Sequence, residues 1–251
     1  MPAEPKHARA IVFDLDDTLF AERDYVRSGL RAVATMIERL HGIAIAIDSL
    51  PAIDPLGALR RRAGLPEAAL DSLLWAYRLH PPVIAARPGA AETLAACRGR
   101  GEAVAVLTDG RSATQRLKID ALGLTFDGIF VSEEIGATKP SPAGYRAVER
   151  ALPASNYVYI ADNPSKDFIA PNAIGWLTIG LRPGEGAIHR HDEATLPDGA
   201  APAVWTTDFS EIAAVLAATA INAPFDRVRS EQRSAAGSRA APRRIRSHHT
   251  G

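Results

Sequence analysis

The chain has 251 residues, of which 47% are hydrophobic and 23% charged, a composition typical of a globular protein with a sizeable core. This composition excludes fibrous, collagen-like and wholly disordered proteins. The single cysteine, Cys97, cannot form an internal disulfide or a thiolate metal cluster, so we expect a small buried side chain there. No apolar stretch approaches the roughly 18 residues of a membrane-spanning helix, and residues 1–9 are polar. We therefore expect a cytoplasmic protein with no membrane partner.

The net charge of zero conceals an uneven distribution. Residues 226–251 contain seven arginines against Asp226 and Glu231, so this tail has a formal charge of +5 and residues 1–225 one of −5. Small and polar residues separate the arginines, and the tail has no aromatic side chain on which a nucleic acid base could stack. We expect a disordered, solvated tail and no nucleic acid partner, with tethering to an anionic partner as the alternative.

Short runs of β-branched and aromatic residues alternate with segments of helical periodicity. The predicted strands are residues 9–13, 103–107, 128–131, 157–161 and 176–179, with a weaker one near Val204. The predicted helices among them are residues 89–100, 112–122, 142–152, 165–172 and 209–219. This alternation predicts an α/β fold, a doubly wound, mostly parallel, Rossmann-like sheet with helices on both faces.

A long interval between the first two predicted strands breaks this alternation. It contains apolar residues at helical spacing, first from Tyr25 to Leu40 and then from Leu70 to Tyr77. We therefore predict a small helical domain inserted after the first strand. The predicted parts are a discontinuous Rossmann-like core of residues 1–18 and 87–225, a helical domain of residues 19–86 and a tail of residues 226–251.

Polar and charged residues follow four of the predicted strands. Because ligands bind at the carboxyl ends of parallel strands, these residues are candidates for a functional site. They are Asp14, Asp16 and Thr18 after the first strand, Thr108, Asp109 and Gly110 after the second, Lys139 beyond the third, and Asp162 and Asp167 after the fourth. Each alone could be an acidic turn, a helix cap or a surface lysine, but their order at successive strand ends predicts a single site.

The residue types indicate phosphate chemistry. Alternation along the strand is expected to aim Asp14 and Asp16 to the same side, which is costly unless a cation such as Mg²⁺ neutralises them. The hydroxyl of Thr108 and the flexible backbone at Gly110 precede a helix and offer donors to an anion. Lys139 offers a compact countercharge.

In this order, Asp14-x-Asp16-x-Thr18, Thr108, Lys139 and Asp162 with Asp167 resemble the four motifs of the haloacid dehalogenase superfamily. The resemblance spans about residues 9–180. It includes Arg87-Pro88-Gly89, Gln115 and Lys118 after Thr108, and Glu134-Ile135-Gly136 before Lys139. One departure is Ala161, where the family often has glycine before the metal-binding aspartate.

The resemblance implies the catalytic roles. Asp14 would be the nucleophile that forms an aspartyl-phosphate, and Asp16 would protonate the leaving alkoxide and then activate water. Lys139 would neutralise the charge of the phosphoryl group and restrain Asp14. Asp167 would position Lys139 or a metal-bound water.

The resemblance also implies the ligand sets. Mg²⁺ would be held by Asp14, by the backbone carbonyl of Asp16 and by Asp162. Thr108, together with the amides near Asp109 and Gly110, would bind the phosphoryl oxygens.

The carboxylate of Asp16 separates two branches of this superfamily. The branch that displaces halide from carbon typically lacks it, whereas a phosphate ester releases a poor alkoxide leaving group. We therefore expect a Mg²⁺-dependent phosphatase of a small phosphorylated metabolite. A phosphosugar mutase and a noncatalytic phosphate-binding or regulatory protein on the same fold are the alternatives.

By the same resemblance, residues 19–86 would be a cap that closes over the site and shapes the substrate pocket. The candidate pocket residues are Arg23, Tyr25, Arg27, Trp75, Tyr77, Arg78 and His80. For Trp75 and Tyr77 we favour packing in the core, and for His80 packing or capping.

Overall fold

The computed structural model of the protein describes residues 5–184 and 196–219. Within them, six strands form one sheet in the order β3-β2-β1-β4-β5-β6, and every neighbouring pair is parallel. The strands are β1 (His7–Phe13), β2 (Ala103–Thr108), β3 (Gly128–Val131), β4 (Ala154–Ala161), β5 (Leu177–Leu181) and β6 (Val204–Thr206). The predicted α/β fold is confirmed, while the predicted tail of residues 226–251 lies outside the described residues.

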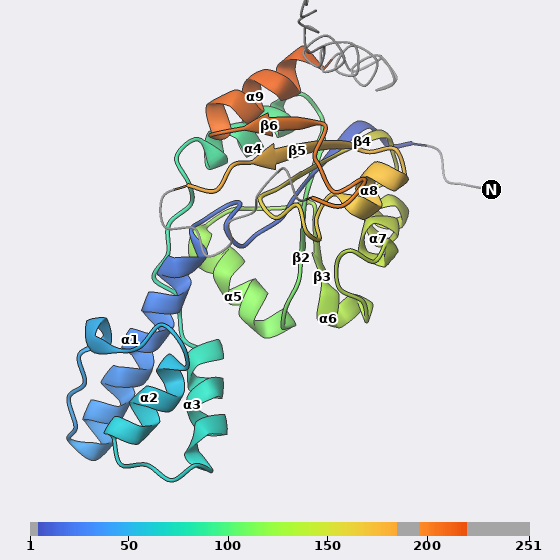
Figure 1. Cartoon of the computed structure of the whole chain (residues 1–251). Helices are drawn as coiled ribbons and strands as arrows, with labels where there is room; N and C mark the ends of the chain where they lie inside the picture. The colour runs from blue at the N-terminus through green and yellow to red at the C-terminus, as the bar shows by residue number, and fades with distance from the viewer. Residues whose placement is uncertain (1–4, 185–195, 220–251) are drawn as a thin grey trace, which may run out of the picture.

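Helices cover both faces of this sheet (Figure 1). On one face lie α4 (Ala90–Gly99), α5 (Ser112–Leu122) and α9 (Phe209–Ala218), and on the other α7 (Ala143–Ala151) and α8 (Ile169–Ala173). The short α6 (Ser132–Ile135) follows β3 directly. Alternation along β1 sends Ile11 and Phe13 into the first layer and Val12 into the second. Since both faces of the sheet are covered, the last four residues of β1 and the first five of β2 are all apolar.

Four predicted elements begin later than the sequence pattern indicates: α4, α7 and β5 by one residue and α8 by four. The helix predicted from residue 165 begins at Ile169, because the side chain of Asn163 accepts hydrogen bonds from the amide and hydroxyl of Ser165 and holds a turn there. The strand predicted from residue 176 begins at Leu177, because the amide of Trp176 donates to the carbonyl of Pro171 in α8 at 2.9 Å. Cys97 is fully buried, and burial raises the pKa of its thiol to about 12, as expected for a packing residue.

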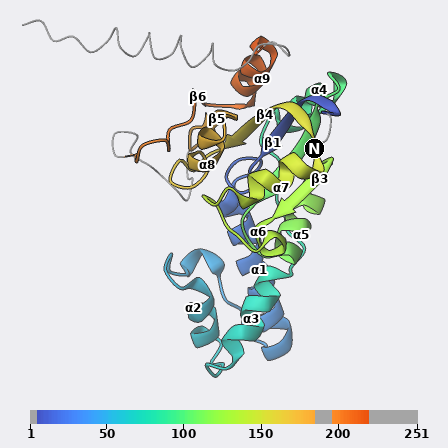
Figure 2. The same cartoon turned by 90° about the vertical axis from the view of Figure 1, so that its right-hand side faces the viewer.

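Between β1 and β2 the chain forms a helical unit with its own apolar core. It contains α1 (Glu22–His41), a short 3₁₀ helix (Ile47–Ser49), α2 (Pro55–Arg62) and α3 (Ala69–Arg78). Val33, Ile37, Leu59 and Leu73 are among the buried residues of this second core. Figures 1 and 2 show the unit as a lobe beside the sheet.

The two chain segments that join this helical unit to the sheet lie side by side. The amide of Arg87 donates to the carbonyl of Leu19 at 2.8 Å, and Phe20 and Ala86 form an antiparallel bridge. The guanidinium of Arg87 also donates to the carbonyl of Asp17 at 2.7 Å. The unit is therefore joined to the sheet layer by one paired connection, while the limits at residues 18, 19, 86 and 87 stay predictions.

The buried Arg9 links the amino end of the sheet to α9 through hydrogen bonds. Nε of Arg9 donates to Glu102 at 2.8 Å, and its Nη atoms donate to the hydroxyl of Thr219 and the carbonyl of Leu216, both at 2.7 Å. Arg9 is 2% exposed, so its charge depends on these partners. In the described part of the chain no helix is both long and apolar enough to cross a membrane.

Candidate active site

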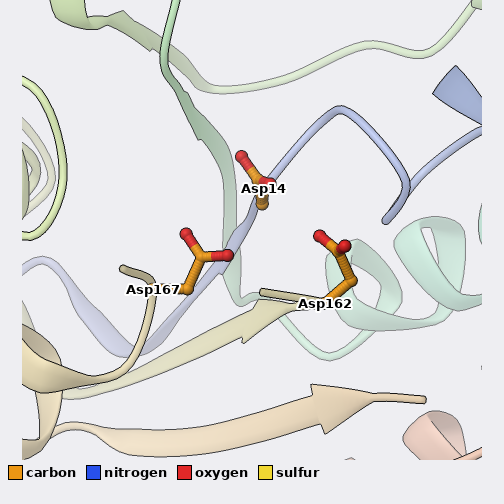
Figure 3. Close-up of side chains that lie close together, drawn as sticks. All are labelled: Asp14, Asp162 and Asp167. Carbon is orange, nitrogen blue, oxygen red and sulfur yellow. The ribbon is translucent and has the colours of Figure 1, made fainter. Parts of the chain in front are cut away.

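Three buried carboxylates meet where the sheet order reverses. The chain runs outward from β1 through β2 to β3 and then returns to β4 on the other side of β1. Such a switch point leaves a crevice at the carboxyl ends of the two central strands. Asp14 follows β1 and Asp162 follows β4, and Asp167 lies five residues further on. One carboxylate oxygen from each lies within 4.8 Å of the others (Figure 3).

The backbone and a neighbouring hydroxyl help to hold these residues in place. The amide of Asp14 donates to the carbonyl of Ile160 at 2.8 Å, so the β1 to β4 pairing extends one residue beyond Phe13. The hydroxyl of Thr18 donates to Oδ1 of Asp162 at 3.2 Å. The amide of Asn163 donates to Asp167 at 3.1 Å. The predicted residues Asp14, Asp162 and Asp167 are thus brought together.

The electrostatics of the three carboxylates fit a bound cation. Burial, and next the charge of Asp14, raise the pKa of Asp162 to about 8, and burial raises the pKa of Asp167 as well. Ionised carboxylates this close together are costly to bury unless a positive charge compensates them. Oxygen ligands of this kind suit a hard divalent ion, so the residues present fit Mg²⁺.

Lys139 supplies a fixed positive charge beside these carboxylates. Its Nζ lies 2.7 Å from Oδ1 of Asp14 and 2.7 Å from Oδ1 of Asp167. Burial lowers the pKa of Lys139, but the charges of Asp14 and Asp167 outweigh burial and hold the pKa well above its ordinary value. The ammonium group therefore stays protonated, and Asp167 is in contact with it.

Two tyrosines that the sequence analysis missed complete this cluster. The hydroxyl of Tyr159 accepts a hydrogen bond from Lys139 at 2.9 Å, and the hydroxyl of Tyr145 donates to the carbonyl of Asp167 at 2.8 Å. Burial raises the pKa of Tyr159 well above its usual range, so the phenol stays neutral. Tyr159 lies inside β4 rather than after it, where a search of strand ends does not look.

Asp16, the second aspartate of the first motif, contacts other residues than the three clustered carboxylates do. Oδ1 of Asp16 is 2.7 Å from Nζ of Lys118, and Oδ2 accepts from Nε2 of Gln115 at 2.8 Å. Strand alternation does not describe this segment, because β1 ends at Phe13 and Asp17 has a left-handed backbone with φ of 54°. The carboxylate of Asp16 is therefore aimed at α5.

Of the predicted phosphate-binding residues, Thr108 is the last residue of β2, and Asp109 and Gly110 follow it. The buried hydroxyl of Thr108 accepts from Nε2 of Gln115 at 2.6 Å. The amide of Gly110 is engaged with the hydroxyl of Ser132 at 2.9 Å, a partner that the sequence pattern did not indicate. The carboxylate of Asp109 accepts from the backbone amide of Lys139 at 3.2 Å, so Asp109 holds the lysine segment.

Tyr25 and Tyr77 of the helical unit pack against the core of the first layer beside the sheet. Tyr25 is buried and packs edge to face on Tyr77, with ring centroids 5.5 Å apart. The ring of His80 lies 2.6 Å from the carbonyl of Tyr77 and 3.0 Å from the hydroxyl of Ser28, as expected for a packing role. The packing role favoured for Trp75 is wrong, because its side chain is 50% exposed and lies under the guanidinium of Arg78.

Other candidate pocket residues have their own partners. Arg27 forms an ion pair with Asp48 at 2.9 Å, and Arg23 lies 3.9 Å from Asp24. Glu22, which the sequence analysis missed, begins α1 close to Asp16. Burial, and next the charge of Asp16, raise the pKa of Glu22 to about 7.

Comparison with known proteins agrees with this architecture. A family model described as a haloacid dehalogenase-like hydrolase matches residues 8–175. Glyceraldehyde 3-phosphate phosphatase of Methanocaldococcus jannaschii is 26% identical over 208 residues, covering 74% of this chain and 90% of that protein. Phosphoglycolate phosphatase of Neisseria meningitidis is 30% identical over 223 residues, covering 79% of this chain and 91% of that protein.

A solved structure shows the same fold. A protein of Thermotoga maritima assigned as a β-phosphoglucomutase superposes with a TM-score of 0.62 at 19% sequence identity. The superposition covers 84% of this chain and 100% of that one. At this identity the likeness concerns the arrangement of the chain alone.

Proposed function

This chain belongs to the haloacid dehalogenase-like hydrolase family, and we propose that it is a Mg²⁺-dependent phosphatase that acts on a small phosphate monoester. The coarser class, a hydrolase acting on phosphoric monoester bonds, is confirmed by relatives named as phosphatases. The observation that supports the finer proposal is the buried group of Asp14, Asp162 and Asp167 around Lys139.

The metal would be held by Asp14, by the backbone carbonyl of Asp16 and by Asp162. Bound there, Mg²⁺ would supply positive charge to the phosphoryl oxygens. Burial and the charge of Asp14 raise the pKa of Asp162, so this carboxylate needs a cation in order to ionise at neutral pH.

The first half of the reaction transfers the phosphoryl group to Asp14. A carboxylate oxygen of Asp14 forms a bond to phosphorus as the bond from phosphorus to the ester oxygen breaks. Asp16, which must enter this step protonated, gives its proton to that oxygen, which leaves as an alcohol. Lys139 stays protonated beside Asp14 and compensates negative charge during the transfer.

The second half releases phosphate and restores the carboxylates. Asp16, now ionised, takes a proton from water as the water oxygen attacks phosphorus. The bond from phosphorus to Asp14 breaks, and inorganic phosphate leaves. The hydroxyl of Thr108 accepts from Gln115 at 2.6 Å and donates to the carbonyl of Asp109 at 3.4 Å. On substrate binding it would exchange this long bond for one to a phosphoryl oxygen.

We assign the helical unit as a cap over this site. Its paired connection beside Asp17 and its contact with α5 through Tyr25 and Lys118 support this assignment. A lid of this kind excludes water and selects the substrate. The partner is a small phosphorylated metabolite.

The test is Mg²⁺-dependent release of inorganic phosphate from a panel of sugar, nucleotide and organic acid phosphates. Asp14→Asn is expected to abolish release, whereas Asp120→Asn, which changes an exposed aspartate on α5, is the matched control and keeps it. Release that survives in Asp14→Asn would remove Asp14 from the nucleophile role. A phosphorylated isomer in place of free phosphate would identify a mutase instead, and phosphate binding without turnover a noncatalytic protein.

A further inference from the structure

The carboxylate of Asp16 is held at both of its oxygens by one helix. Nζ of Lys118 is 2.7 Å from Oδ1, and Nε2 of Gln115 donates to Oδ2 at 2.8 Å. Gln115 and Lys118 lie three positions apart on α5, so both side chains project from the same face of the helix. Asp16 itself lies three residues beyond the end of β1, where the backbone turns before Asp17. Its orientation therefore depends on α5.

Lys118 is buried in aromatic surroundings. The residue is 4% exposed, and its Nζ lies 4.3 Å from the ring centroid of Tyr25 and 5.8 Å from that of Phe20. Aromatic rings attract an ammonium group but cannot accept its proton. A buried ammonium needs a carboxylate partner, and Asp16 is the carboxylate with which Lys118 pairs. Lys118 therefore pairs with Asp16 and is not part of the cluster around Lys139.

Gln115 connects Asp16 to the carboxyl end of β2, where the proposed phosphate-binding residues lie. Its Nε2 lies 2.8 Å from Asp16, 2.6 Å from the hydroxyl of Thr108 and 3.1 Å from the carbonyl of Asp109. Gln115 is 1% exposed, so this amide has a fixed position. One side chain consequently orders a group of the first motif and a group of the second.

We propose that Lys118 is a positioning residue for the acid and base function of Asp16. This inference rests on the proposed function. Lys118 exchanges no proton with the substrate. It holds the carboxylate of Asp16 in one rotamer, with Gln115 as the second point of attachment, so that the carboxylate meets the leaving oxygen in the correct direction.

The surroundings of Lys118 also depend on its contact with the helical unit. Tyr25, whose ring faces the ammonium group, belongs to α1 and packs against Tyr77 next to the end of α3. A movement of the helical unit would therefore change the surroundings of the lysine that holds Asp16. Positioning of the proton donor is in this way coupled to the helices that cover the site.

The experiment is a double-mutant cycle with Lys118→Met and Asp16→Asn. Methionine keeps most of the volume and removes the charge. Lys118→Met is expected to lower kcat for an alkyl phosphate by about tenfold to a hundredfold, as for a displaced catalytic group, with KM changed less than about threefold. In the Asp16→Asn background the same change is expected to cost nothing further, because Lys118 acts through Asp16.

The leaving group provides a readout that a general loss of structure would not reproduce. p-Nitrophenolate leaves without protonation, and kcat/KM reports only the steps up to transfer of the phosphoryl group to Asp14, before Asp16 acts as a base. We therefore expect kcat/KM to fall much less for p-nitrophenyl phosphate than for the alkyl phosphate. Arg116→Met is the matched control, since it removes an exposed charge from the same helix and is expected to leave both rates unchanged. The double variant removes both charges of the buried pair, and its Tm shows whether the packing survives.

The outcomes separate the two proposals. Losses that multiply in the double variant, or equal losses of kcat/KM for the two leaving groups, would overturn the role of Lys118 while the phosphatase proposal stands. Absence of Mg²⁺-dependent turnover in the unmodified protein would overturn the proposed function and this inference with it. Non-additive losses confined to the alkyl phosphate would establish Lys118 as a positioning residue.

Discussion

Nζ of Lys139 lies 2.7 Å from a carboxylate oxygen of Asp14 and the same distance from one of Asp167. Lys139 therefore pairs with Asp14, the proposed nucleophile after β1, and also with Asp167, which follows β4. Tyr159 contributes a third contact at 2.9 Å. Because all these groups are buried, the position of the ammonium group is determined by charge pairing as much as by packing.

Replacing Lys139 by methionine is expected to remove both activity and stability. The change leaves Asp14 and Asp167 without their common countercharge, and breaking a buried pair on one side costs about 3–5 kcal/mol. Turnover is expected to fall by a factor of about 10² or more, since a charge that compensates the transferred phosphoryl group is lost. Steady-state kinetics and urea unfolding measure the two effects. Lys6→Met, which changes an exposed lysine just before β1, is the control, and near-native turnover of Lys139→Met would contradict the assignment.

Stability without metal is expected to fall as the pH rises. The pKa of Asp162 is raised from about 3.8 to about 8, so between these values the folded state binds more protons than the unfolded state. The free energy of unfolding therefore decreases from about pH 4 to about pH 8. Thermal unfolding in EDTA at pH 5 and pH 8 tests this, and Asp162→Asn is expected to flatten the dependence.

Added Mg²⁺ is expected to counteract that decrease. A bound cation favours the ionised carboxylate, so the increase in Tm on adding Mg²⁺ is expected to be larger at pH 8 than at pH 5. Glu22, whose pKa burial and the charge of Asp16 raise to about 7, contributes to the pH dependence in the same direction. Glu22→Gln removes its part of the dependence and is expected to keep the response to Mg²⁺. An equal response at both pH values would argue against metal binding at Asp162.

The hydroxyl of Tyr159 is expected to have a measurable effect on turnover. Tyr159→Phe removes one of the three contacts of Lys139 and keeps the ring that packs edge to face on Tyr145. Loss of one hydrogen bond to a charged group costs about 1.5–3 kcal/mol. We therefore expect a lower free energy of unfolding and a several-fold lower kcat. Tyr157→Phe, two residues earlier in β4 and bonded to Leu152 instead, is expected to leave kcat unchanged. An unaltered kcat in Tyr159→Phe would show that Asp14 and Asp167 hold Lys139 without it.

The buried arginine at the other end of β1 is expected to affect stability alone. Arg9→Met leaves Glu102 buried with the partly exposed Arg100 as its remaining cationic partner and is expected to cost about 3–5 kcal/mol. Arg146→Met breaks an exposed pair with Glu149 and is expected to cost no more than about 1 kcal/mol. Urea unfolding compares the two. A kcat per folded molecule that changed in Arg9→Met would show that the two ends of the strand are coupled.

The sequence by itself determined the fold class and which residues reach the carboxyl edge of the sheet. Apolar runs must be buried on both faces of a parallel sheet, and a strand that ends at Phe13 or Ala161 delivers the next residue to that edge. Asp14 and Asp162 could therefore be identified from local pattern. Lys139 was identified by its distance from the third strand and by its resemblance to a family motif.

The tertiary structure alone decided which partners these residues have. The direction of Asp16 depends on a turn after the strand and on Lys118, which is 102 positions away in the sequence, so strand alternation could not predict it. Tyr159 was missed because a tyrosine within a strand has the pattern of a packing residue until Lys139 lies beside its hydroxyl. Exposure of Trp75 depends on how α3 lies against α1, which periodicity within α3 does not define. Side-chain contacts between distant segments are set by packing, and packing is a property of the whole chain.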